Sequence, residues 1–170
     1  ENNVLNFEIY PPTMESFETG DFSELEWEFA GYTISWPNND PIEAFEIVDD
    51  IPGVSWSVVT DDQYDGIYSA KSADITHNQA TFASVTAEVI ASSDISFYYR
   101  VATEYSSSGN YFYDGLIFFI DGVEVDRYQP TPSGGTPWTQ VNYPVSAGTR
   151  TFAWAFVKDG GDGNTLIPEN

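Results

Sequence analysis

Residues 116–128 read LIFFIDGVEVDRY, in which two apolar runs stand on either side of Asp121-Gly122. A two-residue Asp-Gly loop between apolar runs is the strongest short-range signal of a β-hairpin, because both loop positions tolerate a positive φ. The stretch therefore predicts two antiparallel strands, over residues 116–120 and 123–128. Helical patterns are nearly absent elsewhere, which favours the all-β class.

Period-two patterns continue on both sides of this hairpin. Residues 95–101 alternate between a larger apolar set and a second set that includes Ser96 and Arg100, as expected for a strand with one face on a core. Phe152, Trp154 and Phe156 share one parity, which predicts a strand buried on its large-residue face. That strand follows a turn at 146–148 and a strand over 140–145, and further strands are predicted over 14–17, 56–60, 67–71 and 82–89. A total near ten predicts an antiparallel β-sandwich of the jelly-roll type.

One segment carries a helix signal. Asp40 stands at a capping position, Pro41 at the first helical position and Glu43 at the third, and residues 44–48 follow. This pattern predicts one short helix within a loop.

The composition limits the possible partners. Twenty-seven acidic residues face five basic ones, and the net charge of −22 repels phosphate backbones and anionic membranes. Nucleic acid is thereby excluded as a partner. The chain has no cysteine and no run of 18 apolar residues, so we expect no disulfide, no thiolate metal site and no membrane insertion. The acidity itself is compatible with a solvated secreted surface or with carboxylates gathered around Ca²⁺.

The 170 residues predict one domain, with ends that differ from its middle. Residues 1–13 contain an apolar segment, Val4 to Tyr10, that precedes Pro11-Pro12, and they are predicted to form a linker or an extra edge strand. Residues 14–160 carry the strand patterns of the predicted jelly-roll domain. Residues 161–170 are predicted to be a flexible C-terminal loop, or the truncated end of a domain that lacks its last strand.

Seven motifs follow one another along residues 14–160 in an order that is more specific than any one of them. They are ESFETGDF (15–22), YDGIYSAKS (64–72), ISFYYRV (95–101), FIDGV (119–123), WTQV (138–141), YPVSAGT (143–149) and WAFVKDG (154–160). Together they resemble the cleaved-adhesin and MAM-like jelly-roll modules appended to secreted bacterial peptidases and adhesins. The resemblance implies a noncatalytic accessory module, extracellular or at the cell surface, with adjacent domains in the same polypeptide.

The chain departs from this family pattern in two places. Family members close with a strand that carries a Trp-Ile-Asp type signature, which the sequence up to Asn170 lacks, and its Asp would be one metal ligand. Residues 32–53 form an insertion relative to the compact pattern, and specificity of this member would lie there.

The resemblance also implies a structural cation, Ca²⁺, near the start of the sandwich, where Glu18 matches the family's ligand position. A hard cation takes six to eight oxygen ligands, often in Gly-containing loops, so Asp21 and the backbone at Gly20 are further candidates, with Asp74 as a weaker one. Solvated loop carboxylates or turn caps are the alternative interpretation. The later Asp159-Gly-Gly-Asp-Gly-Asn run lacks EF-hand spacing and is predicted to be a flexible loop.

Aromatic side chains in polar loops are candidate ligand contacts. Tyr111 and Tyr113 follow the polar run Ser106-Ser107-Ser108-Gly109-Asn110, and Trp36 and Trp138 lie beside turn residues. Exposed rings stack on sugars, so these four residues are the predicted contacts for a glycan or a surface protein. Rings that anchor the core or a loop are the alternative.

Catalysis is not expected. His77 is the single histidine, and no Gly-x-Ser-x-Gly run presents a nucleophile to it. The main functional hypothesis is an accessory module for adhesion or for carbohydrate or protein binding. The alternative is a structural subunit or spacer of a surface assembly or filament, in which Val4 to Tyr10 would be donated as a strand to a neighbour.

Overall fold

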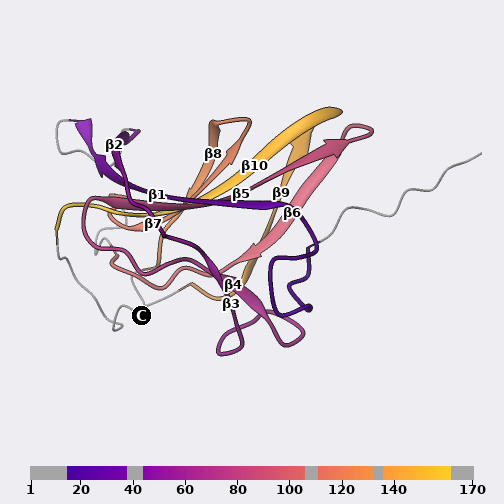
Figure 1. The fold of residues 1–170 in the computed structure, drawn as a ribbon, viewed down its shortest axis with the longest axis horizontal. Coiled ribbons are helices and arrows are strands. Elements are labelled where there is room, and N and C mark those ends of the chain that lie inside the picture. The colour runs from indigo at the N-terminus through magenta and orange to yellow at the C-terminus, as the bar shows by residue number, and fades with distance from the viewer. Residues whose placement is uncertain (1–14, 38–43, 106–110, 132–135, 162–170) are drawn as a thin grey trace, which may run out of the picture.

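The computed structural model describes residues 15–37, 44–105, 111–131 and 136–161 (Figure 1). Ten β-strands and no helix lie within this part of the chain. Six strands form one antiparallel sheet in the order β2-β1-β5-β10-β7-β8. Their bounds are β1 (Trp27–Ser35), β2 (Glu46–Asp50), β5 (Gln79–Val89), β7 (Gly115–Ile120), β8 (Val123–Tyr128) and β10 (Gly148–Lys158).

The predicted Asp-Gly hairpin is confirmed as β7–β8. Asp121 and Gly122 have φ values of 53° and 76°, and Ile120 pairs with Val123 across them. β10 then pairs with β7 on one side and with β5 on the other, so the strand that contains Phe152, Trp154 and Phe156 lies in the interior of the sheet.

Four strands outside the large sheet form two antiparallel pairs. One pair is β6 (Ser93–Tyr99) with β9 (Thr139–Val145), side by side in Figure 1, and the other is β3 (Ser57–Val59) with β4 (Ser69–Lys71). Ile95, Phe97 and Val141 of the β6–β9 pair pack on Phe118 and Phe152 of the large sheet. The antiparallel β-sandwich is thereby confirmed, whereas the jelly-roll order of its strands stays a prediction.

The large sheet also buries part of its opposite face. Ile117, Ala155 and Val157 are fully buried there, and Trp36 and Phe112 pack over them. Prediction placed the large residues of β10 in the core, and Phe152 is buried, but the small residues on the other side of the same strand are buried as well. A central strand covered on both sides loses a clean alternation, because both faces exclude water.

Two local predictions are wrong. The helix expected over residues 40–48 is replaced, in its described part, by the edge strand β2, because β1 continues to Ser35 and offers a free edge to Ile47 and its neighbours. The strand expected over 14–17 is replaced, from Glu15 onward, by a turn. Phe17 has a φ of 59°, and its carbonyl accepts a hydrogen bond from Gly20 N, so the chain folds back on itself.

Three sequence predictions fall wholly or largely outside the described residues. They are the linker or edge strand over 1–13, the apolar segment Val4 to Tyr10, and the C-terminal segment, of which only Gly161 is described. Residues 32–53, predicted to be an insertion, complete β1 and supply β2. A helix with the length and apolar character needed to span a membrane is not found among the described residues.

Candidate functional site

The segment before β7 presents two tyrosine rings on one side. Tyr111 is 47% exposed and Tyr113 half-buried, whereas the residues that follow each of them, Phe112 and Asp114, are buried. The two tyrosines thus alternate along the chain with two buried residues. The two tyrosine rings lie nearly parallel, at 9°, with centroids 6.1 Å apart.

The buried side of this segment is held in place by close packing. Phe112 lies in the outer core with Ile117, and the Arg127 guanidinium lies 5.3 Å from the centre of its ring. A Cβ at Gly115 would stand 2.3 Å from the Tyr128 carbonyl oxygen and 2.7 Å from the Phe112 ring. Only glycine permits this approach, which fixes where the segment enters the sheet.

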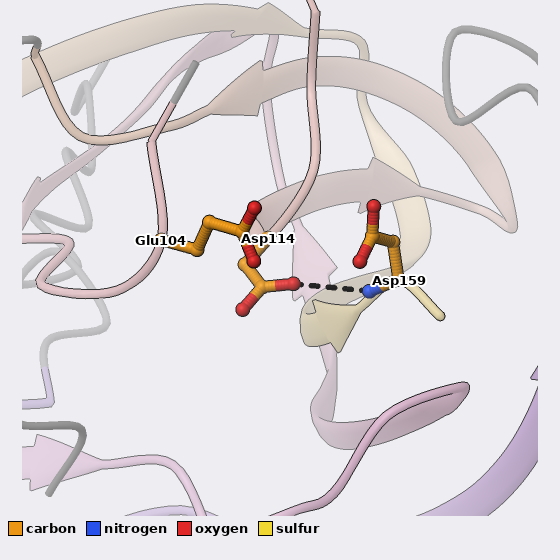
Figure 2. A group of neighbouring side chains, drawn as sticks. All are labelled: Glu104, Asp114 and Asp159. Atoms are coloured by element: carbon orange, nitrogen blue, oxygen red, sulfur yellow. Dashed lines mark hydrogen bonds between the residues drawn. The ribbon is translucent and has the colours of Figure 1, made fainter. Parts of the chain in front are cut away.

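Three carboxyl groups converge directly beneath the segment. Oxygens of Glu104, Asp114 and Asp159 lie within 4.8 Å of one another, and Figure 2 shows the three side chains gathered around Asp114. Asp114 Oδ2 accepts a hydrogen bond from Thr103 Oγ1 at 2.9 Å, and Asp114 Oδ1 accepts one from Asp159 N at 3.0 Å. Glu104 and Asp114 are buried, and Asp159 is half-buried.

A buried cation completes this group. Lys158, the last residue of β10, places Nζ 3.6 Å from Asp114 Oδ2, and the lysine is only 4% exposed. Burial raises the pKa of Asp114 to about 6, helped by the negative charge of Glu104. The hydrogen bonds from Asp159 and Thr103, and the Lys158 ammonium, oppose this rise. The carboxyl group therefore titrates near neutral pH rather than in acid.

The spacing of the three carboxyl groups is that of a possible cation site, and no other group of this kind occurs among the described residues. The Lys158 ammonium already places a positive charge against Asp114. A divalent ion a few ångströms away would be repelled by that ammonium. We therefore assign the cluster to the buried ion pair.

The predicted calcium ligands lie elsewhere and have other contacts. Glu18 Oε1 accepts hydrogen bonds from Ile67 N at 2.9 Å and Tyr68 N at 3.2 Å, which ties the first turn to the loop before β4. Asp21 Oδ1 caps its own turn by accepting from Thr19 Oγ1 and Ser23 N. Asp74 is exposed. These contacts support the turn-cap interpretation of Glu18 and Asp21, and calcium binding stays a prediction.

The two predicted tryptophan contacts occupy different environments. Trp36 is 7% exposed and packs edge-on against Phe45 in the outer core, which supports the interpretation of a core anchor. Trp138 is half-buried and donates from Nε1 to Asp62 Oδ1 at 3.1 Å. Asp62 also pairs with Arg100, so Trp138 belongs to a junction between the β3–β4 loop and the β6–β9 pair.

Sequence reasoning named Tyr111 and Tyr113, whose rings lie near each other, and their role as ligand contacts stays a prediction; it missed the neighbouring charged residues. Glu104, Asp114 and Lys158 are separated along the chain, and only the pairing of β10 with β7 joins two of them. One signal was available in the sequence. Lys158 falls on the same face of its strand as Phe152, Trp154 and Phe156, which is the face predicted to be buried. A second exposed pair, Tyr64 on Tyr98 with ring centroids 3.6 Å apart, was also missed.

Comparison with models of known protein families, with curated protein sequences and with solved structures gives no match to this chain. The functional argument therefore depends on the geometry described above.

Proposed function

We propose that this chain is a noncatalytic, extracellular accessory module that binds a glycan through the platform formed by Tyr111 and Tyr113. The observation that carries the proposal is the pair of nearly parallel rings, 6.1 Å apart, on a segment whose alternate residues are buried. Rings that are fixed from below lose little conformational entropy when they stack on a ligand.

Charge favours a neutral saccharide as the ligand. The net charge of −22 repels sulfated, sialylated or phosphorylated groups, whereas the apolar face of a neutral sugar ring stacks on tyrosine without ionic contacts. The resemblance to modules of secreted peptidases and adhesins supports the same function, since such modules attach a larger protein to a surface. Adjacent domains of the same polypeptide would then supply any enzymatic activity.

The position of the carboxyl groups supports a noncatalytic role. Asp114 and Glu104 are buried, so a polymeric substrate has no access to them in this structure. A hollow of about 260 Å³ is lined by residues 29–32 and 50–54, and none of the three clustered carboxyl groups lines it. A hydrolytic pair would have to face a cleft that admits the scissile bond.

Glycan-array binding followed by calorimetric titration of the best ligand tests the proposal. We expect Tyr111→Ala and Tyr113→Ala each to weaken binding by about tenfold, the loss of one stacked ring. Tyr64→Ala is the matched control, because Tyr64 is also an exposed ring but stacks with Tyr98 elsewhere on the surface. Absence of glycan binding, or equal affinity of both variants and wild type, would show that the platform has another use, such as contact with a surface protein.

The edges of the large sheet favour this function over strand donation. The two edge strands, β2 and β8, each contain a register shift, and they carry acidic residues such as Asp49 and Glu124. Bulges and charges on an edge strand prevent the addition of another strand. We therefore expect a monomer in sedimentation at high protein concentration, and a stable dimer or filament would revive the structural alternative.

A further inference from the structure

The buried pair Lys158 and Asp114 brings a primary amine and a carboxyl group together inside the sandwich. Val157 of β10 pairs with Gly115 of β7, so the residues just beyond them, Lys158 and Asp114, stand next to each other across the two strands. Their side chains are 5% and 0% exposed, and Nζ lies 3.6 Å from Asp114 Oδ2. Reacting groups fixed at such a separation behave as if at very high concentration.

We propose that Lys158 and Asp114 become joined by an intramolecular amide bond, which makes this domain a covalently cross-linked sandwich. One proton first passes from the Lys158 ammonium to the Asp114 carboxylate, and the lone pair of the neutral Nζ then attacks Cγ of the protonated carboxyl group. The Nζ–Cγ bond forms and one Cγ–O bond breaks. The departing hydroxyl oxygen takes one proton from the nitrogen and leaves as water, so the reaction needs no oxidant, reductant or co-substrate.

The groups around Asp114 match the needs of this step. Asp159 N donates to Oδ1 at 3.0 Å, which suits Oδ1 as the carbonyl oxygen that is retained. Thr103 Oγ1 donates to Oδ2, the oxygen nearer to Nζ, which suits Oδ2 as the oxygen that leaves. The Glu104 carboxylate, whose oxygen lies within 4.8 Å of an Asp114 oxygen, carries the proton from the nitrogen to the leaving oxygen.

Burial drives the reaction forward. Two charges inside a protein carry a desolvation cost, and conversion of the ion pair into a neutral amide removes both charges. The raised pKa of Asp114, about 6, keeps an appreciable fraction of its carboxyl group protonated near neutral pH. The water released leaves a site that excludes solvent, which opposes hydrolysis of the amide.

Mass spectrometry of the full chain under denaturing conditions tests the proposal directly. After incubation near pH 6, we expect wild type to weigh one water molecule less than its sequence requires. Tandem spectra after proteolysis should contain a branched peptide that joins residue 158 to residue 114. Lys158→Arg should keep the full mass, because a guanidinium stays protonated and is no nucleophile. Glu104→Gln should form the bond at least about a hundredfold more slowly, the low end of the range for lost acid–base catalysis.

A succinimide formed at an Asp-Gly sequence such as Asp121-Gly122 would also release one water, so it must be distinguished from the amide. A succinimide would persist in Lys158→Arg and would lie within a single linear peptide, so the branched peptide distinguishes the two products. The wild-type measurement is decisive even if a variant fails to fold. A folded wild type that retains the full sequence mass, or that lacks the branched peptide, would overturn the proposal.

Discussion

The same two strands, β7 and β10, carry an ion pair at each end, and the two pairs differ in almost every physical property. At one end Arg150 Nη1 lies 2.7 Å from Asp121 Oδ2, with side chains 27% and 39% exposed. At the other end Lys158 Nζ lies 3.6 Å from Asp114 Oδ2, with side chains 5% and 0% exposed. The shorter pair is solvated and the longer one is buried, so distance alone does not rank them.

The pKa values show the consequence of burial. Asp121 accepts a hydrogen bond from Thr151 N and faces Arg150, and its pKa is lowered. Asp114 has comparable donors, but burial outweighs them and raises its pKa. The same residue type on the same strand pair therefore has opposite preferences for its proton, because desolvation is the largest effect at Asp114, whereas hydrogen bonds outweigh it at Asp121.

The largest expected difference between the two ends concerns loss of the cation. Lys158→Ala leaves a carboxylate buried without its partner, and we expect a loss of about 3–5 kcal/mol in the free energy of unfolding. The matched change at the exposed end, Arg150→Ala, should cost much less, since water solvates the remaining Asp121. Urea denaturation of both variants measures the contrast, and equal losses would contradict it.

A cross-link would enlarge this difference. If the amide bond forms, wild type should also exceed Lys158→Arg in stability by about 4 kcal/mol, from loop-closure entropy for a chain linked between residues 114 and 158. Urea denaturation of wild type that shows the mass loss provides the comparison. Equal unfolding midpoints for wild type and Lys158→Arg would show that wild type has no stabilising cross-link that the variant lacks.

The pH dependence should have opposite signs at the two ends. In Lys158→Arg, which cannot form an amide, Asp114 prefers its proton in the folded state, so its stabilising contribution is present below its usual pKa and is lost as the pH rises through about 6. The reference is the double variant that carries both Lys158→Arg and Asp114→Asn. Relative to it, we expect the free energy of unfolding of Lys158→Arg to fall by at most roughly 3 kcal/mol between pH 4 and pH 6. Glu104, Asp159 and residue 158 face this carboxyl group and are present in both proteins. A flat difference would show that Asp114 is ionised as usual.

At the exposed end, the lowered pKa of Asp121 gives stability that is present above its usual pKa and lost as the pH falls through the folded value. We expect Asp121→Asn to remove this small contribution, so that the variant is slightly less stable than wild type near neutral pH and the difference disappears in acid. The difference between wild type and Asp121→Asn in unfolding midpoint, followed from pH 6 down to pH 3, measures it. A difference that stayed constant, or that grew as the pH fell, would contradict the assignment.

The smallest effect on stability is expected at the tyrosine platform above the buried end. Tyr111 is exposed, so Tyr111→Ala should change the free energy of unfolding by no more than about 0.5 kcal/mol. Thermal unfolding measures this change, and Phe112→Ala, which removes the buried neighbour, is the control that should destabilise the domain by about 3–5 kcal/mol. A large loss in Tyr111→Ala would show that the ring is structural.

Prediction succeeded where the signal is local. Asp121-Gly122 fixed a hairpin, and the period-two patterns located β6 and β10. It failed at β2, because a capping pattern over 40–43 competes with a free edge on β1 that no local pattern reveals. It also failed to find Glu104 and Asp114 as neighbours of Lys158, because each looks like one more acidic residue in a chain that has 27.

By itself the sequence determined the antiparallel strands, the turn chemistry and the strongly acidic charge. These properties follow from side-chain size, backbone preference and charge, which act over a few residues or over the whole chain. Only the tertiary structure decided which carboxyl group is buried, since that depends on β10 entering between β5 and β7. Burial then set the high pKa of Asp114 and its contact with Lys158, because desolvation is a property of the packed interior.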